Sequence, residues 1–437
     1  MVNKFPVTLL LLFAAVCGSL RAQSVWSLRQ CIDYALDHNI SVRQQQLNVR
    51  NAEIQLETSR YQRLPDLNAN LSQGFGFGRS SARDGSTVDR TSANTSFSLS
   101  ASMPLFTGFR IPNQVRAGEF NLKAASASLE KARQDISVQV ATAYLQTLYY
   151  DGTARIAQQQ VELNREELRI AAAQVEAGRK PESEKAQAEA KLALSEHSLT
   201  QAEGNARLAL LDLRQLLNLP DTVFGIAEPD TSSLLADIPM PSAVFAQAEA
   251  VHPSVTAARY SLEVSRRNLK VARSYNWPSL SLSASYSNSY YHIFDQENAS
   301  FGKQLDLNGS EYVGLNLSIP IFNRFQTRNS IRQSRLNLAA GQQSLLLARQ
   351  NLRKEIEQAY CNAVNARFNL ASAQKAASAA TVSYRYAFDS YAAGRGTQID
   401  LQNAQTQMLK ARQDALQARY EFLIRMKILD YYNGVPF

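Results

Sequence analysis

The sequence lacks several features that mark common protein classes. After residue 22, no apolar run approaches the roughly 18 residues that a membrane-spanning helix requires, which excludes such a helix from that part of the chain. Only three cysteines are present, and Cys31 and Cys361 lie far apart, so we expect no disulfide framework. The four histidines are scattered without metal-ligand spacing, and we expect no metal site.

Clustered charge and catalytic motifs are also scarce. The formal net charge is +8, but basic residues alternate with Asp and Glu along helical patterns, so we expect no nucleic-acid partner. No Ser/His/Asp or Cys/His arrangement is placed for catalysis. The glycine-rich stretch 74–78 is followed by neither the helix nor the lysine of a phosphate-binding loop. We therefore expect no enzyme and no cofactor.

The N-terminus has the pattern of a cleaved secretory signal. Lys4 is followed by an apolar stretch, Val7–Val16, that only Thr8 interrupts, then by small residues and by Ala22 before Gln23. We expect a signal peptide over residues 1–22 and a mature chain that begins near Gln23. Lipidation at Cys17 is the alternative.

The dominant feature is an internal repeat. A long helical tract runs from about Asn113 to the stop signal Ala177-Gly178-Arg179. A second runs from Asn329 to Ala393-Gly394-Arg395, a shift of 393 − 177 = 216 residues. The shift superimposes two apolar series of seven-residue spacing, Leu122, Leu129, Ile136, Ala143 and Leu338, Leu345, Leu352, Ala359. That spacing is typical of coiled coils, so each tract predicts a helix about 100 Å long.

Alternation of apolar and polar residues predicts two strands in each half. They cover about 66–77 and 95–105, then about 279–291 and 312–321. The apolar residues expected to face lipid are Phe97, Leu99, Met103, Leu105, Leu280, Leu282, Leu315, Leu317 and Ile319. A strand of about 11 residues tilted by about 45° spans roughly 26 Å, the height of the apolar band of an outer-membrane barrel. A soluble sheet with one buried face gives the same alternation.

Each half therefore reads helix, strand, strand, very long helix, tip, helix. The first repeat covers 23–218, a connector 219–241 and the second repeat 242–434, with tips near 178 and 394. The first helix is expected from Trp26 to about Tyr61. Four strands cannot close a barrel, and an open edge in lipid leaves backbone groups unsatisfied. Closure must come from several chains, giving 8, 12 or 16 strands in a dimer, trimer or tetramer.

This arrangement resembles the TolC family of outer-membrane efflux factors over essentially the whole mature chain. The resemblance rests on the duplicated register, the turns at Gly178 and Gly394, and two proline-containing strand ends, Met103-Pro104-Leu105-Phe106 and Ile319-Pro320-Ile321-Phe322. It implies a mainly α fold with transmembrane β, a homotrimer with a 12-stranded barrel, and a periplasmic α-helical coiled-coil barrel. It also implies an exit duct for efflux or type I secretion in the outer membrane of a Gram-negative bacterium, working with a periplasmic adaptor protein and an inner-membrane transporter.

The resemblance also assigns residues to the periplasmic tip. The gate residues carried over are Gly178, Ser183, Glu184, Tyr391, Gly394, Arg395, Asp400 and Asn403. The two tip turns, Ala177-Gly178-Arg179 and Ala393-Gly394-Arg395, are expected to bind the adaptor. Two positions depart from the family pattern, because a second acidic residue falls on Asn403 and the arginine of the family's latch falls on Gly396, one position after Arg395.

Asp400 has two compatible interpretations. With Thr397 it has the spacing of a helix-start contact. Three copies around an axis would also attract cations at a constriction. Two other functional classes remain open from the sequence, a periplasmic adaptor and a non-conducting envelope scaffold. An adaptor holds a single hairpin between compact β domains, whereas here the unit is doubled.

Overall fold

The computed structural model describes residues 25–81, 85–220, 224–228, 237–294 and 296–435. The expected signal peptide and the alternative lipidation site Cys17 lie outside these residues. The chain forms two compact units. Unit 1 comprises the described parts of Met1–Gln46, Ser128–Val255 and Arg349–Phe437, and unit 2 comprises Leu47–Ala127 and Thr256–Ala348. Each unit draws on both halves of the sequence.

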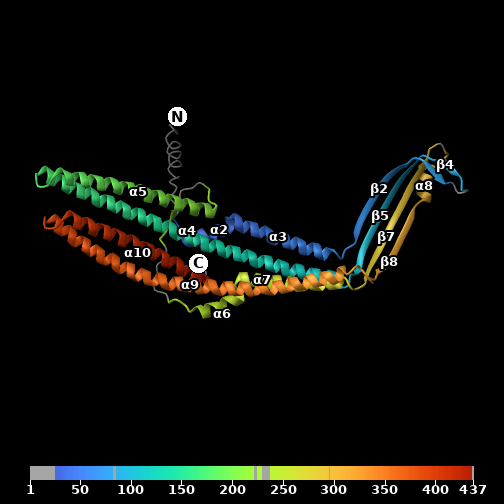
Figure 1. Cartoon of the computed structure of the whole chain (residues 1–437). Helices are drawn as coiled ribbons and strands as arrows, with labels where there is room; N and C mark the ends of the chain where they lie inside the picture. The colour runs from blue at the N-terminus through green and yellow to red at the C-terminus, as the bar shows by residue number, and fades with distance from the viewer. Residues whose placement is uncertain (1–24, 82–84, 221–223, 229–236, 295, 436–437) are drawn as a thin grey trace, which may run out of the picture. The chain divides into compact units, whose positions relative to one another are not determined.

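A four-stranded antiparallel sheet dominates unit 2 (Figure 1). Its strands are β2 (Asp66–Gly76), β5 (Ser92–Phe106), β7 (Ser279–Ile293) and β8 (Ser310–Ser318), in the order β2-β5-β7-β8. These bounds lie within a few residues of the predicted strands, because strict alternation is a strong local signal. Strands β2 and β8 form the two edges.

The strand register separates an apolar face from a polar one. Leu99 pairs with Ala69 and Tyr286, and Leu282 pairs with Met103 and Leu315, so these side chains point to the same side. The opposite face carries mostly Ser and Asn, and Ser72 hydrogen-bonds Ser96 across it at 2.6 Å. Seven of the nine residues expected to face lipid share the apolar face, namely Phe97, Leu99, Met103, Leu280, Leu282, Leu315 and Leu317.

Two of the expected residues fall outside this regular pattern. The register shifts between Pro104 and Phe106, and Phe106 rather than Leu105 pairs with Leu280. Proline lacks the N–H that a ladder needs, which accounts for the irregularity. Ile319 lies one residue beyond the end of β8.

Four helices continue the four strands in the same order. Helix α3 (Ile40–Tyr61) leads into β2, α4 (Arg110–Glu176) follows β5, α7 (Pro253–Ser274) leads into β7, and α9 (Gln326–Ala392) follows β8. A Cβ added at Gly118 of α4 would lie 3.1 Å from Leu56 of α3. The rings of Phe120 (α4) and Tyr260 (α7) lie 6.3 Å apart. A Cβ at Gly341 of α9 would lie 3.4 Å from Leu262 of α7, so the helices of unit 2 form one layer.

The two strand-to-helix junctions repeat the same geometry. Residues Gly108 and Phe109 have φ of 60° and 67°, and the pair 216 residues later, Arg324 and Phe325, has φ of 53° and 61°. Each junction carries a perpendicular ring pair, with centroids 5.5 Å apart for Phe106 and Phe109 and 5.4 Å for Phe322 and Phe325. Consecutive left-handed residues turn the chain sharply from strand to helix.

The loops that join β2 to β5 and β7 to β8, which we call the outer loops, contain short elements that the sequence did not predict. The first loop forms a small hairpin, β3 (Arg79–Ser81) and β4 (Thr87–Asp89), and the second contains helix α8 (Phe301–Leu307). This second loop covers the edge of β7 beyond β8. Side-chain amides of Asn308, Gln304 and Asn298 hydrogen-bond the backbone of Ser289, Tyr291 and Ile293, respectively.

Unit 1 is helical and holds the main apolar core. It contains α2 (Leu28–His38), α5 (Glu182–Leu217), α6 (Pro241–Val251) and α10 (Gln398–Tyr432), with parts of α4 and α9. Strands β1 (Val25–Trp26) and β6 (Gly225–Ile226) pair in parallel. Tyr144, Leu145, Leu213 and Leu217 are fully buried in the larger cluster, and Phe422 and Met426 in a second one. No helix among the described residues is long and apolar enough to cross a membrane.

The expectation of a single helix from Trp26 to about Tyr61 is wrong, because the helical pattern there forms two helices, α2 and α3. Asn39 has an extended ψ of 131° and separates α2 from α3. Its side chain donates to the carbonyl of Leu216 at 2.9 Å and accepts from the N–H of Ser41 at 2.8 Å. An asparagine that serves the backbone of its own turn and of another helix competes with the helical hydrogen bond.

Candidate functional site

The candidate site is the pair of tip turns in unit 1. Gly178 follows α4 with φ of 69°, and Gly394 follows α9 with φ of 71°. At both turns the glycine N–H bonds three residues back, Gly178 to Val175 and Gly394 to Tyr391, and the following arginine N–H bonds five residues back. This is the Schellman pattern, which requires a left-handed residue and therefore favours glycine. Ala177, Arg179, Ala393 and Arg395 are exposed beside the glycines.

Lys180 joins the two tips. Its Nζ lies 2.5 Å from Oε2 of Glu184 and donates to the Tyr391 hydroxyl at 2.7 Å. The ammonium also lies 4.3 Å from the centre of the Tyr391 ring, and Tyr391 is only 9% exposed. Burial alone lowers the pKa of Lys180, but the hydrogen bonds and charge of Glu184 and Tyr391 outweigh it and raise the pKa. The lysine is therefore held in its charged form between the two hairpins.

The structure thus brings Glu184 and Tyr391 together but through a residue that sequence reasoning missed. Lys180 lies between a turn glycine and a proline, a position at which a solvated lysine is the ordinary expectation. Only its place two residues after Gly178, opposite a buried tyrosine on the second hairpin, gives it a partner. Ser183 is exposed on the first turn of α5.

The departure at Gly396 has a packing reason. A Cβ added at Gly396 would lie 3.1 Å from the Tyr391 nitrogen and 3.3 Å from Ser390 atoms, so a larger residue requires the turn to move. Arg395 is exposed one position earlier. The cation at the centre of the tip contacts is Lys180 of the first hairpin, not an arginine of the second.

Asp400 takes part in the start of helix α10. Thr397 is the N-cap, and its hydroxyl accepts from the Asp400 N–H at 3.1 Å and donates to the Asp400 carboxylate at 2.6 Å. The helix-start interpretation is therefore confirmed. Asp400 and Asn403 are both exposed in the single chain.

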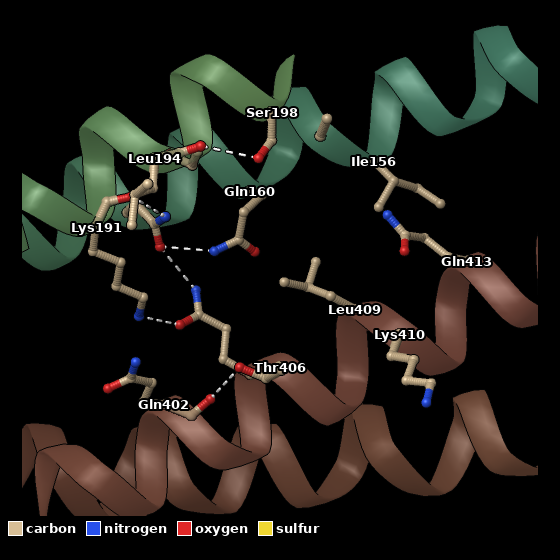
Figure 2. A pocket seen from close by; sticks show the side chains of 14 residues that line it. Ile156, Gln160, Lys191, Leu194, Ser198, Gln402, Thr406, Leu409, Lys410 and Gln413 are labelled. Atoms are coloured by element: carbon tan, nitrogen blue, oxygen red, sulfur yellow. Dashed lines mark hydrogen bonds between the residues drawn. The ribbon is translucent and has the colours of Figure 1, made fainter. Parts of the chain in front are cut away.

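A buried polar network lies along the hairpins beyond the tip contacts (Figure 2). Gln405 of α10, 1% exposed, donates to Asn164 of α4 at 3.1 Å and accepts a short hydrogen bond from Lys191 of α5. Lys191 also donates to Glu167 at 2.6 Å. Gln160 donates to Asn164 at 2.8 Å. These contacts join three helices through groups that are costly to leave unpaired when buried.

The network borders an open groove of about 410 Å³ between α4, α5 and α10 (Figure 2). Its walls combine amides and hydroxyls with Ile156, Leu194 and Leu409. Within the part of the chain that the structure describes, no three His, Cys, Asp or Glu side chains gather to hold a metal ion. The chemistry of this region is that of a helix junction held by polar side-chain contacts.

Comparison with known proteins identifies the family. A family model described as outer membrane efflux protein matches residues 31–219 and 244–433. The outer membrane efflux protein BepC of Brucella suis is 24% identical over 322 residues, which cover 73% of this chain and 68% of BepC. The outer membrane protein TolC of Escherichia coli is 27% identical over 230 residues, which cover 51% of this chain and 46% of TolC.

The solved structures show the same fold. The crystal structure of the Campylobacter jejuni CmeC outer membrane channel superimposes with a TM-score of 0.78 at 20% identity, covering 94% of this chain and 86% of CmeC. The resemblance to the TolC family is thereby confirmed. Because the family model spans most of the sequence, the chain belongs to the outer membrane efflux protein family, the exit ducts of the outer membrane.

Proposed function

We propose that three copies of this chain form a passive exit duct, with a 12-stranded barrel in the outer membrane and a coiled-coil barrel in the periplasm. The observation that carries the proposal is the open sheet of unit 2. Strands β2 and β8 each have one neighbour, so each leaves one row of backbone groups unpaired in the single chain. In lipid such a row costs several kcal/mol per group unless another chain pairs with it.

The edge of β7 supports the same assembly. Beyond the end of β8, three side-chain amides occupy the backbone groups of Ser289, Tyr291 and Ile293. This stretch is therefore closed to a further strand, while β2 and β8 are open over their length. Pairing of β8 with β2 of the next copy closes a ring without blocked positions.

An exposed apolar stripe on α3 also indicates a contact with another helix. Ile40, Leu47, Ile54 and Tyr61 recur every seven residues and are 69%, 69%, 51% and 61% exposed in the single chain. Seven-residue spacing is the pattern of a coiled-coil seam, and an exposed seam indicates a missing helix. A neighbouring copy of this chain supplies it in the proposed trimer.

The apolar face of the sheet suits contact with lipid. Leu71, Val313 and Leu315 are 72%, 74% and 66% exposed, far above what a soluble sheet leaves uncovered. Phe75 and Phe77, also exposed, extend toward the outer loops as an interfacial aromatic girdle. Leu105 and Ile319, next to the strand irregularity and the strand end, continue the band toward the periplasm.

The tips are the proposed gate and docking site. Lys180, Glu184 and Tyr391 hold the two hairpins of one chain together, and opening requires this contact to break. The exposed turns Ala177-Gly178-Arg179 and Ala393-Gly394-Arg395 receive the periplasmic adaptor, which connects the duct to an inner-membrane transporter. Cargo passes through the lumen without covalent chemistry, so its selection belongs to the transporter.

Asp400 adds a charge to this gate. Three copies around the trimer axis attract cations and impede anions at the narrow end. Asp400→Asn keeps the helix-start geometry and removes the charge. We expect cation selectivity in planar bilayers to fall for this variant and to stay unchanged for the neutral control Asn403→Gln. Equal selectivity in wild type and Asp400→Asn would show that Asp400 does not act on ions in the pore.

The assembly is tested by fractionation and native mass spectrometry of the full chain. We expect the protein in the outer-membrane fraction, and a detergent-extracted species of three chains. A soluble monomer favours the adaptor class. An outer-membrane trimer without conductance in planar bilayers favours the scaffold class. Either result would overturn the duct.

A further inference from the structure

The helical layer of unit 2 is strongly basic, although charges alternate along the chain as a whole. The chain has 46 Lys and Arg and 38 Asp and Glu. The helical segments 47–65, 107–127, 256–278 and 320–348 contain 15 of these basic residues but only 4 of the acidic ones. The rest of the chain is thus slightly acidic. Four segments that are distant in sequence produce one basic surface, which a linear inspection of charge does not detect.

Six exposed residues of this surface form what we call the basic belt: Arg116, Lys270, Arg273, Arg328, Arg332 and Arg335. Among the described residues, none of the six has a carboxylate within ion-pair distance, whereas Arg50, Arg60 and Arg266 of the same unit do. Arg328 lies 5.7 Å from the Phe325 ring. The belt is therefore a set of uncompensated cations beside the strand-to-helix junctions.

Three belt residues, Lys270, Arg328 and Arg335, share one face of the helical layer. At 100° per residue, Lys270 lies roughly 80° around α7 from Leu262, which faces α9, whereas Arg273 lies only roughly 20° from it. On α9, Arg335 and Arg328 lie roughly 120° and 140° from Gly341, which faces α7, and Arg332 lies roughly 180° from it, on the side away from α7. Because α7 and α9 run antiparallel, these rotations turn Lys270, Arg328 and Arg335 toward the same side. The opposite side carries uncharged residues, Ser261 and Asn268 on α7 and Ser330 and Asn337 on α9.

That face continues the apolar face of the sheet. In β7 the backbone groups of Tyr291 and Ile293 point toward the β8 side, and their side chains belong to the polar face. Seen from the polar face with the outer loops upward, β7 runs upward, and the chirality of L-residues then places β8 to the right of β7. The order of the strands from left to right is therefore β2-β5-β7-β8. The helices keep this order. Because α7 is a right-handed helix, Lys270 then lies on the apolar side of the layer, together with Arg328 and Arg335.

The belt also lies at the right height for a membrane surface. Arg328 is the third residue of α9 and Arg335 the tenth, so they start about 3 and 14 Å from the end of the helix. The perpendicular ring pairs Phe106–Phe109 and Phe322–Phe325 lie between belt and sheet, where interfacial aromatics collect. A headgroup layer adds roughly 5–8 Å beyond the hydrocarbon, within reach of an arginine side chain.

We propose that the basic belt binds the phosphate groups of anionic glycerophospholipids in the inner leaflet of the outer membrane. The belt is mostly arginine, whose planar fork matches phosphate oxygens in a bidentate way. Basic clusters next to a membrane-spanning segment attract anionic lipid at short range. The proposal rests on the proposed membrane insertion of the sheet. It adds a lipid preference that anchors the junction between strands and helices.

The test compares two variants of the full-length assembly on the same helix. The first is Arg328→Gln, Arg332→Gln, Arg335→Gln. The control, Arg367→Gln, Lys375→Gln, Arg385→Gln, removes the same charge from exposed positions of α9 in unit 1. Each protein is inserted into nanodiscs of phosphatidylethanolamine with a minor share of phosphatidylglycerol, and the lipids retained on the protein are identified by native mass spectrometry.

We expect wild type and control to retain phosphatidylglycerol in preference, and the belt variant to lose this enrichment by about tenfold or more. Lysine at the three belt positions should restore most of it, since the charge returns. If the inserted wild type and the inserted belt variant retained phosphatidylglycerol equally, the proposal that the belt binds anionic lipid would be refuted. Failure of all proteins to enter nanodiscs would instead refute the proposed membrane insertion.

Discussion

At the scale of single residues, the cation that contacts Tyr391 is Lys180 of the first hairpin, whereas the resemblance led us to look for an arginine on the second. The family position is Gly396, where a Cβ would meet the Tyr391 backbone at 3.1 Å. The same Tyr391 is reached from the first hairpin by Lys180, which also holds Glu184. The contact between the two hairpins therefore depends on a lysine of the first hairpin.

Lys180→Met is expected to loosen the tip. The change removes the ammonium and leaves the half-buried Glu184 carboxylate without its partner, at a cost of about 1 kcal/mol per chain. The open state should gain several-fold in population, seen as larger or longer conductance steps in planar bilayers. Lys185→Met, which removes a more exposed lysine one turn later, serves as the control. Identical steps for Lys180→Met and wild type would rule out the contact as a gate.

His252 separates α6 from α7 and links stability to pH. Its ring bonds Ser254 at 2.7 Å and the Tyr431 hydroxyl at 3.1 Å. Burial, with a contribution from the Lys131 charge, lowers the pKa of His252 to about 4 from its ordinary value of 6.5. Between about pH 4 and pH 6.5, His252 therefore binds a proton more readily in the unfolded chain than in the folded one.

The resulting prediction is a loss of stability in acid. Stability from the neutral His252 is complete above pH 6.5 and falls as the pH drops toward 4, by about 3 kcal/mol in total. His252→Gln should flatten the fall in thermal midpoint between pH 7.5 and 4.5, measured at one scan rate. His197→Gln, on the exposed surface of α5, should keep it. A wild-type slope in His252→Gln would show that other groups cause the acid sensitivity.

At the scale of elements, turns and strands followed from the sequence where the signal was local. The two glycine stop signals became Schellman turns, and each predicted strand lies within a few residues of an observed one. The break at Asn39 did not follow, because it depends on a hydrogen bond to Leu216, 177 positions away. Helix α8 is anchored in the same way, by Asn288 and Gln304 contacts with neighbouring backbone.

The tip glycines give a prediction at this scale. Gly178→Ala places a Cβ on a residue with φ of 69° and should cost about 1 kcal/mol, although nothing lies within 4 Å of the added atom. Gly204→Ala makes the same chemical change inside α5, with equally open space and no positive φ, and should stabilise by up to about 1 kcal/mol. Relative to wild type, we expect the thermal midpoint to fall for Gly178→Ala and to rise for Gly204→Ala. A stabilising Gly178→Ala would contradict the turn geometry.

At the scale of the whole molecule, the duplication predicted the chain order but not the environment of each copy. Tyr144 and Tyr360 are 216 residues apart. Tyr144 is fully buried, with its hydroxyl at the carbonyls of Trp26 and Ala227, whereas Tyr360 approaches Met240 at 3.9 Å near the surface. The difference comes from β1 and β6, which pair beside Tyr144 and, among the residues that the structure describes, have no counterpart in the second repeat. The repeat therefore determines the order of elements in each half, and packing determines how buried the equivalent residues are.

The number of chains also lay beyond the sequence pattern, since four strands per chain suit more than one ring. The structure narrows the question to two free edges, β2 and β8. Everything proposed for the duct, including the lumen and the outer position of the basic belt, depends on these edges meeting in neighbouring copies.

Disulfide cross-linking between the two edges tests this central claim most directly. Asn70→Cys in β2 is combined in turn with Tyr312→Cys, Gly314→Cys or Asn316→Cys in β8, in a chain with Cys361→Ser to remove the exposed thiol. Within one chain two strands separate β2 from β8, too far for a disulfide. We predict covalent species that end at three chains on non-reducing gels for at least one pair. No cross-link from any pair, or a ladder that continues past three chains, would contradict the closed trimeric barrel.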